Sequence, residues 1–369
     1  MNVVSVIMLV FCILGGLDRL LGNRFGIGKE FEKGFMLLGT LALSMIGMIV
    51  LSPLIATWLS PAFEWIYRTL HIDPSIIPAS LFANDMGGAP LAKEVAQNEQ
   101  LGMFNALVVS SMMGCTISFS IPYALGIVKK EVQKEMFFGI LCGIVTIPIG
   151  CFVAGLICRI PITLLLVDLL PLILLAAIIA CGLTFAPTVT VKIFSIIGAM
   201  MRILITIGLL LGIAEFLTGY TIIEGLADIT EGANICFNAA VTLSGAFPLM
   251  YIVSKLLAKP IQTFGNALGI EPTSAMGFVS TIVTNATTFE MLNRMDKKGV
   301  ALNSAFLVSA AFVLGGHLAF TMAFDADYIL AVSVGKLTAG VCAVLLAVVL
   351  YRRVYKPNVC IEQKHTASV

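Results

Sequence analysis

Ile72-Asp73-Pro74-Ser75 opens a stretch of the chain that runs through small and apolar residues to Asn84 and Asp85. A second stretch opens with nearly the same signature, Ile270-Glu271-Pro272-Thr273, and runs to Asn285; it stands 198 positions further on. A doubled, interrupted apolar segment in matching halves of a hydrophobic chain is typical of the binding site of a transporter. We therefore expect these two stretches to decide both the fold and the site.

The composition predicts an integral membrane protein. Of the 369 residues, 59% are apolar and only 12% are charged, and the mean hydropathy is +1.02. A soluble protein carries roughly 45–50% apolar and about 25% charged residues, so this chain departs in both directions at once. The lipid bilayer is the expected surrounding. A formal net charge of +1 argues against nucleic acid as a partner.

The sequence contains no motif for catalysis, cofactor binding or metal binding. The nine cysteines are scattered and form no Cys-x-x-Cys pair, which argues against both a zinc site and a disulfide framework. No Ser-His-Asp arrangement, P-loop, His-Glu-x-x-His or dinucleotide fingerprint is present. We expect no enzyme activity, no cofactor and no metal. The N-terminus lacks the charged region of a cleavable signal peptide, so its first apolar segment should remain as a span.

Nine segments reach the length of about 20 mostly apolar residues that a membrane helix needs. They are 3–22, 34–56, 101–127, 135–158, 161–183, 196–218, 233–254, 300–322 and 327–351. Two further regions, 73–92 and 271–291, are apolar but interrupted by Pro, Gly, Asn and acidic residues. We expect both to be re-entrant hairpins, although a single full span is the alternative for each.

Loop charges set the predicted orientation, because lysine and arginine favour the cytoplasmic side. Basic residues in 19–33 and 128–134 place those loops inside, so region 73–92 enters and leaves on the outer face. Loops 219–232 and 323–327 are acidic and contain no lysine or arginine, which places them outside. The N-terminus is then expected outside and the C-terminus inside. Nine spans and two hairpins satisfy every loop.

The two halves of the chain are predicted to be inverted repeats. At an offset of 198, Gly34 matches Gly232, Asn105 matches Asn303 and Ser111 matches Ser309. Matching hydropathy with opposite loop charge is what an inverted-topology repeat predicts. The expected organisation is a first repeat at 1–158, a linking span and loop at 159–195, a second repeat at 196–356 and a cytoplasmic tail at 357–369.

The predicted fold class is therefore an all-α polytopic membrane protein. Each repeat is expected to run helix, helix, amphipathic surface segment, re-entrant hairpin, helix, helix. The surface segment of the first half is 57–72, where aromatic residues suit the membrane interface. By analogy of layout alone, hairpin-bearing inverted repeats are similar to elevator-type transporters.

The stretch that follows the first signature holds the most informative candidate site residues. Asn84, Asp85 and Gly87 lie where two glycines and Pro90 interrupt the helix. A carboxylate at membrane depth costs roughly 2.5–3.5 kcal/mol and persists only in a polar cavity or against a partner. A small cationic amine would provide that partner. The alternative is that Asp85 caps the helix that begins near Gly87.

Further candidate binding residues are hydroxyl, amide, acidic and imidazole side chains in both halves. They are Ser111, Thr116, Ser118, Asn285, Thr287, Thr288, Glu290, Asn303 and His317. For the serines and threonines the competing interpretation is close packing between helices. For His317 it is a hydrogen bond between helices rather than titration or substrate binding. Asp168 is isolated in its span and faces a helix interface or marks an outer boundary.

Several stretches resemble the ethanolamine permease family of bacterial ethanolamine-utilization operons. They are Leu81-Phe82-Ala83-Asn84-Asp85-Met86-Gly87-Gly88, Ser111-Met112-Met113-Gly114-Cys115-Thr116-Ile117, Ile121-Pro122-Tyr123-Ala124-Leu125-Gly126-Ile127 and Val308-Ser309-Ala310-Ala311-Phe312-Val313-Leu314-Gly315-Gly316-His317-Leu318. The resemblance covers essentially the whole chain. It implies a multi-pass plasma-membrane protein that admits ethanolamine, as a facilitator or an ion-coupled secondary carrier, for ethanolamine catabolism. Ethanolamine at neutral pH carries one ammonium and one hydroxyl group.

Two other functions remain open at this point. The first is secondary transport of another small polar solute, such as a nucleoside, on the same architecture. The second is a membrane sensor or assembly subunit without transport activity. The sequence leaves the coupling ion and the assembly into a homo-oligomer undecided.

Overall fold

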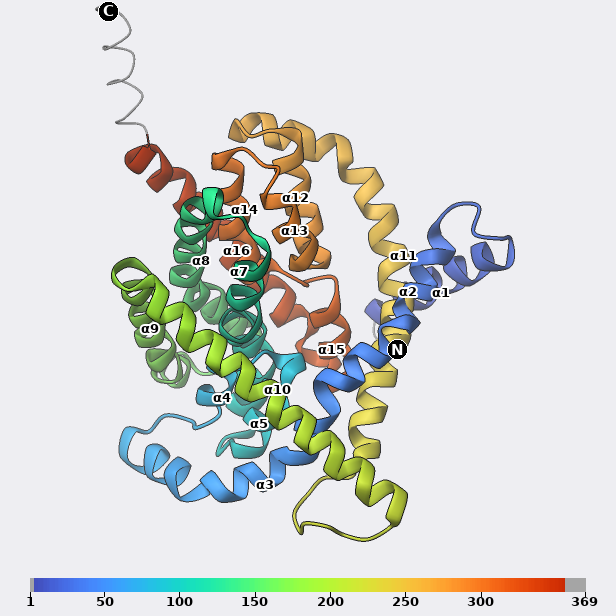
Figure 1. The fold of residues 1–369 in the computed structure, drawn as a ribbon, viewed down its shortest axis with the longest axis vertical. Helices are drawn as coiled ribbons and strands as arrows, with labels where there is room; N and C mark the ends of the chain where they lie inside the picture. Colours follow the sequence, from blue (N-terminus) through green and yellow to red (C-terminus); the bar gives the residue numbers. More distant parts are fainter. Residues whose placement is uncertain (1–2, 356–369) are drawn as a thin grey trace, which may run out of the picture.

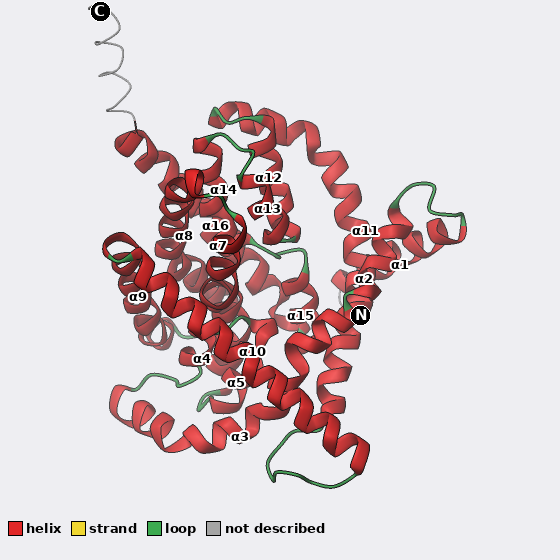
Figure 2. Ribbon diagram, in the orientation of Figure 1, coloured by secondary structure: helices red, strands yellow, loops and turns green. Residues whose placement is uncertain are grey.

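The computed structural model describes the backbone of residues 3–355, and the side chains of these residues except 3, 254, 257–259, 261, 262, 264, 354 and 355. Helices make up nearly all of this part of the chain, and it contains no strand (Figure 2). The all-α prediction is confirmed for the described residues. The predicted tail at 357–369 lies outside them.

Seven helical segments are long and apolar enough to cross a membrane, which makes the chain a multi-pass membrane protein. They are Ile27–Leu70, Glu99–Ile127, Lys130–Ile157, Ile162–Phe185, Pro187–Thr218, Ile229–Val253 and Ala326–Arg353. Each coincides with one of the nine predicted spans. Predicted span 3–22 corresponds to the 18-residue helix α1, and predicted span 300–322 is divided in two.

One group of helices, which we call the frame, is built around α11. This group consists of α1 (Val3–Leu20), α2 (Ile27–Met36), α3 (Leu38–Leu70), α10 (Pro187–Thr218) and α11 (Ile229–Leu268). Helix α11 contacts α1, α2 and α3, and α10 contacts α3. Figure 1 shows α11 as the long helix beside α1 and α2, with α10 crossing diagonally. The predicted surface segment 57–72 is not a separate helix, because α3 continues through Pro53 and Pro61 to Leu70.

A second group, which we call the core bundle, contains both interrupted stretches. Its helices are α4 (Ile76–Leu81), η1 (Asn84–Met86), α5 (Gly88–Val95), α6 (Glu99–Phe104), η2 (Asn105–Gly114), η3 (Thr116–Ser120), α7 (Ile121–Ile127), α8 (Lys130–Ile157), α12 (Pro272–Val283), α13 (Asn285–Leu292), α14 (Lys297–Ala310), α15 (Gly316–Phe324), η4 (Ala326–Tyr328) and α16 (Ile329–Tyr355). Helices α8, α14 and α16 pack on one another at its centre. The remaining helix, α9 (Ile162–Phe185), contacts α8, α10 and α4.

Each interrupted stretch forms two short helices that pack together. Helices α4 and α5 contact each other on either side of a break, and so do α12 and α13. The side chain of an aspartate holds the base of each helix pair together through hydrogen bonds. Asp73 accepts hydrogen bonds from the backbone N–H of Ser75, Gln97 and Asn98. Asp296 accepts from the backbone N–H of Glu271 and Gly299 and from the Ser274 hydroxyl.

The predicted span 300–322 breaks between α14 and α15. Phe312 adopts a left-handed conformation (φ 62°), and Gly315 and Gly316 follow it. The backbone groups freed by this break find partners on α12: the N–H of Phe312 donates to Thr281 O at 3.1 Å and the N–H of Leu314 donates to Ile282 O at 3.0 Å. An interrupted helix is tolerated in a membrane protein where neighbouring protein satisfies its backbone in this way.

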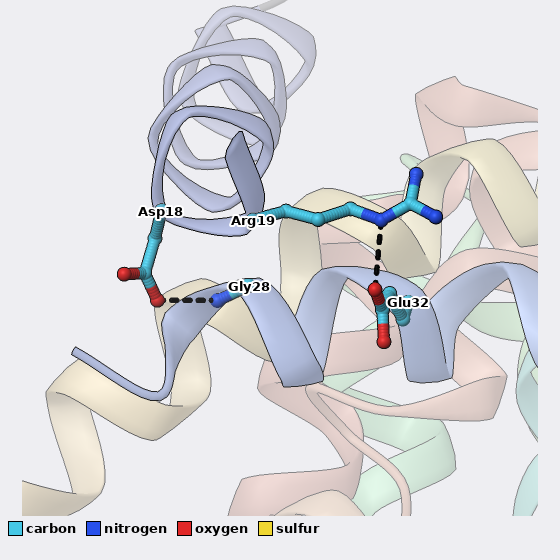
Figure 3. A network of polar contacts seen from close by, with 4 residues as sticks. All are labelled: Asp18, Arg19, Gly28 and Glu32. Carbon is cyan, nitrogen blue, oxygen red and sulfur yellow. Dashed lines mark hydrogen bonds and ion pairs between the residues drawn. The ribbon is translucent and has the colours of Figure 1, made fainter. Parts of the chain in front are cut away.

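The turn between α1 and α2 is held by side chains of opposite charge. The Asp18 carboxylate accepts hydrogen bonds from the backbone N–H of Phe25 at 2.9 Å and of Gly28 at 2.8 Å. Nε of Arg19 lies 2.7 Å from Oε1 of Glu32 on α2 (Figure 3). These contacts fold α2 back along the end of α1 and fix one side of the frame.

Candidate functional site

A cavity of about 390 Å³ lies between the frame and the core bundle. The frame contributes Lys33, Leu37, Thr40, Leu41, Ser44 and Phe247 to its wall. The bundle contributes Asp85, Met86, Cys115, Phe119, Val283, Thr284, Phe312, Gly316 and His317. Both breaks in the paired short helices and the break between α14 and α15 therefore reach the same cavity.

Local backbone chemistry positions Asp85 at the break between α4 and α5. The chain leaves α4 in an extended conformation, and the N–H of Ala83 donates to the Ser118 hydroxyl at 3.0 Å. Gly87 then takes a left-handed backbone conformation (φ 96°) that residues other than glycine rarely adopt, and it packs against Met48. Gly87 itself is the N-cap of α5, with no side-chain oxygen capping that helix among the described residues. The structure thus does not use Asp85 as the cap.

The second break brings Thr284 and Asn285 to the same region. Thr284 is extended between α12 and α13, and its hydroxyl accepts from the N–H of Ala286 at 3.3 Å. The Asn285 amide donates to the Ser120 hydroxyl at 2.8 Å. Ser120 is the last residue of η3, in the first half of the chain, so this bond joins the two halves of the chain beside the cavity.

A buried lysine that the sequence analysis did not single out stands behind the cavity wall. Lys336 on α16 is completely buried. Its Nζ atom lies 2.6 Å from the carbonyl oxygen of Ser111 and 3.2 Å from Nδ1 of His317. It also interacts electrostatically with Asp85. The signal in the sequence was a single cation inside the apolar segment 327–351, since an ionisable residue at membrane depth indicates a functional site by default.

Several of the predicted site residues satisfy backbone groups instead of lining this cavity. Ser111 Oγ donates to Val108 O, and Thr116 Oγ1 donates to the carbonyl oxygens of Met112 and Val308. Thr288 bonds to Thr281 and to the Gly277 carbonyl. These contacts are the helix-packing alternative that the sequence analysis left open for hydroxyl side chains.

The two matched asparagines occupy corresponding places. Asn105 Nδ2 donates to the Ser75 hydroxyl at 2.9 Å, at the base of the first helix pair. Asn303 Nδ2 donates to Ser274 O at 2.8 Å, at the base of the second. Both asparagines are completely buried. The Asn105 amide also lies 3.4 Å from Asp168, which places that isolated carboxylate at a helix interface.

Three other predicted residues differ in their exposure. Thr287 and Glu290 on α13 are exposed, and Thr287 lines a neighbouring cavity of about 310 Å³. That cavity shares Lys33, Phe247, Val283 and Thr284 with the first. Asn84 is completely buried, and neither atom of its amide has a hydrogen-bond partner among the described residues.

The walls of the larger cavity combine one carboxylate with aromatic rings. Phe119 and Phe312 meet edge to face with ring centroids 6.3 Å apart, and the Phe312 ring lies 4.8 Å from that of His317. A carboxylate attracts an ammonium group, and the faces of aromatic rings attract cations. In the described part of the chain, no group of three or more His, Cys, Asp and Glu side chains is placed to hold a metal ion. The arrangement suits a small organic cation.

Comparison with known proteins connects this chain to one family over nearly its whole length. The model of the family described as "Ethanolamine utilisation protein, EutH" matches residues 1–350. The probable ethanolamine permease EutH of Listeria monocytogenes is 44% identical over 362 residues, 98% of this chain and 97% of that protein. The protein of the same name from Salmonella typhimurium is 35% identical, with 95% of each chain covered. The uncharacterized protein YxeR of Bacillus subtilis is 37% identical over 94% of each. No solved structure matches.

Proposed function

This chain belongs to the EutH family of ethanolamine utilisation proteins, and from that premise we propose that it takes up ethanolamine across the membrane as a transporter and not as an enzyme. The observation that carries the proposal is the position of Asp85, a carboxylate at a helix break, on the wall of a cavity of about 390 Å³. Relatives named probable ethanolamine permease support the same substrate.

The chemistry of the cavity matches the two ends of ethanolamine. The Asp85 carboxylate receives the ammonium group, and Phe119, Phe247 and Phe312 surround it with apolar and aromatic surface. The hydroxyl group needs a hydrogen-bonding partner, which the neighbouring polar side chains of Thr284 and His317 offer. The other charged side chain on this wall, Lys33, forms an ion pair with Glu30 at 3.4 Å, which leaves the Asp85 carboxylate to attract a small cation.

We propose that transport uses relative movement of the frame and the core bundle, with the two halves of the chain as inverted repeats. In support, the cavity is lined from both groups, so their movement would open or close it. The paired short helices are each fastened at the base by a matched asparagine, Asn105 or Asn303. The inverted layout of nine spans and two re-entrant hairpins, with the N-terminus outside and the C-terminus inside, belongs to this proposal.

The neighbouring cavity suggests the route by which substrate leaves. It adjoins the site through Thr284 and Val283 and extends along α12 and α13 to Glu30 and Lys33 on α2. The loop between α1 and α2 is the basic one that the charge rule places in the cytoplasm. We propose that this route opens toward the cytoplasm.

Flux of labelled ethanolamine into liposomes that contain the purified protein tests the proposed function. We expect saturable uptake that protein-free liposomes lack. Imposed proton and sodium gradients then separate a facilitator from an ion-coupled carrier, since only the coupled carrier would concentrate ethanolamine. A nucleoside that enters in place of ethanolamine would overturn the proposal, and so would the absence of any flux.

A further inference from the structure

Within the proposed site, His317 has one ring nitrogen in use and one without a partner. Nδ1 lies 3.2 Å from Nζ of Lys336. Nε2 is buried and has no hydrogen-bond partner among the described residues, although His317 itself lines the cavity. A buried polar nitrogen without a partner is costly, so a ligand that satisfies it would bind favourably.

The contact with Lys336 determines where the imidazole proton lies. A lysine ammonium group has three hydrogen-bond donors and no acceptor. One of these points to the Ser111 carbonyl and another to His317 Nδ1. With Lys336 in its charged form, Nδ1 must accept, and the single proton of the neutral ring therefore resides on Nε2. Asp85 supplies the opposite charge in the same cluster.

We propose that Lys336 is a positioning residue that holds His317 as the Nε2–H tautomer, so that this N–H binds the substrate hydroxyl while Asp85 binds the substrate ammonium. The inference rests on the proposed function of the cavity and identifies how its two ends differ. The substrate class becomes a short amino alcohol, because one end of the site needs a cation and the other needs a hydrogen-bond acceptor.

The same arrangement makes the site tolerant of acid. A doubly protonated His317 would repel the substrate ammonium and would compete for Asp85. The charged or titratable side chains around His317 are Lys336 from α16, Asp85 from η1, Cys115 between η2 and η3, and Lys33 from α2, while α11 contributes the uncharged Phe247. Among these side chains, Lys336 is the one whose Nζ contacts Nδ1 of His317. Removal of Lys336 leaves Nδ1 free to bind a proton, so that an imidazole ring already protonated at Nε2 becomes doubly protonated.

A pH series in proteoliposomes tests the inference with Lys336→Met. We measure uptake of labelled ethanolamine by the variant and by the wild type at each pH from 8 to 5.5. The quantity compared is the uptake of the variant divided by that of the wild type. A histidine with an ordinary pKa of about 6.5 is about tenfold depleted in its neutral form at pH 5.5. The ratio should therefore fall about tenfold between these limits. In a His317→Leu background the same Lys336→Met comparison should give a ratio that does not change with pH.

A purely structural lysine would lower uptake equally at every pH, and a flat ratio overturns the inference. If wild-type protein takes up no ethanolamine at all, the proposed function fails instead, so the two failures are distinguishable. Lys336→Leu, which also offers no hydrogen-bond donor to His317 Nδ1, replaces Lys336→Met in the same series if the methionine variant does not insert.

A second measurement leaves Lys336 in place and does not depend on that variant. Ethylamine lacks the hydroxyl group, so it leaves His317 Nε2 without an acceptor, and sites built to bind a hydroxyl reject such analogues strongly. We expect ethylamine to compete with labelled ethanolamine at least tenfold more weakly than unlabelled ethanolamine does in the wild type. His317→Leu should reduce this preference to within about twofold. A preference that survives His317→Leu overturns the assigned role.

Discussion

The amide of Asn285, at the start of α13, donates a hydrogen bond to the hydroxyl of Ser120, which lies 165 positions earlier in the chain. Both side chains are buried. The bond connects the second helix break to the end of η3 in the first half of the chain, and it lies beside the cavity that both breaks reach. One buried polar contact thereby joins the two halves of the chain next to the proposed substrate site.

Asn285→Ala should destabilise the protein and impair uptake. The substitution leaves the Ser120 hydroxyl buried without this donor, which costs about 1–3 kcal/mol. Thermal unfolding in detergent and ethanolamine uptake measure the two effects. Glu290→Ala, at an exposed residue of the same helix that lines neither of the two cavities, is the matched control and should change neither. Equal melting temperatures for Asn285→Ala and the control would contradict the structural role of the bond.

Asp85→Asn should lower ethanolamine uptake about tenfold or more without affecting insertion into the membrane. The amide keeps the size of the carboxylate but loses the charge that attracts an ammonium group, and a hydrogen bond to a charged group is worth about 1.5–3 kcal/mol. Uptake by vesicles that contain equal amounts of protein measures the change. Glu290→Gln is the control, because Glu290 is an exposed acidic residue and its charge should not matter. Normal uptake by Asp85→Asn would remove Asp85 from the site.

Gly87→Ala should destabilise the first helix break. An alanine at φ 96° is strained by about 1–2 kcal/mol, and its Cβ would collide with the side chain of Met48. We expect a lower melting temperature and reduced uptake together. Gly126→Ala is the control, because Gly126 has nothing within 4 Å of an added Cβ. A Gly87→Ala protein as stable as this control would show that the break relaxes freely.

Single cysteines in the loops test the predicted inversion of the halves. In a background without the native cysteines, Thr221→Cys should react with a membrane-impermeant thiol reagent added to intact cells. Lys130→Cys should react only after the membrane is permeabilised. The expectation follows from the acidic loop 219–232 and the basic loop 128–134. Labelling of both cysteines from the same side would mean that the halves are not inverted.

Much of the fold was predictable because it depends on local chemistry. Seven of the predicted spans coincide with helices long and apolar enough to cross a membrane. The helix breaks at Asn84–Gly88 and at Thr284 lie where Gly, Pro and Asn interrupt apolar sequence. The break between α14 and α15 was missed although Gly315 and Gly316 lie beside it, because the partners that satisfy the backbone of Phe312 and Leu314 belong to α12. The sequence of one segment does not show the hydrogen bonds that another segment offers.

The site was predictable only in part, for the same physical reason. Asp85 and His317 were chosen as polar residues at predicted depth, and the structure places both on the cavity wall. Glu290 and Thr287 were chosen on the same ground, yet both are exposed on α13 and neither lines this cavity. Which face of a helix is covered depends on its neighbours, and residues of equal polarity a few positions apart can therefore differ completely in burial.

By itself, the sequence determined that this chain enters a membrane, where most of its long helices run and where the two interrupted stretches break, because hydropathy and the backbone limits of glycine and proline act over a few residues. Only the tertiary structure decided that Lys336 reaches Ser111 and His317, and that two breaks far apart in the chain meet at one cavity. Those contacts depend on how distant helices pack, and packing is set by the shapes of all the partners together.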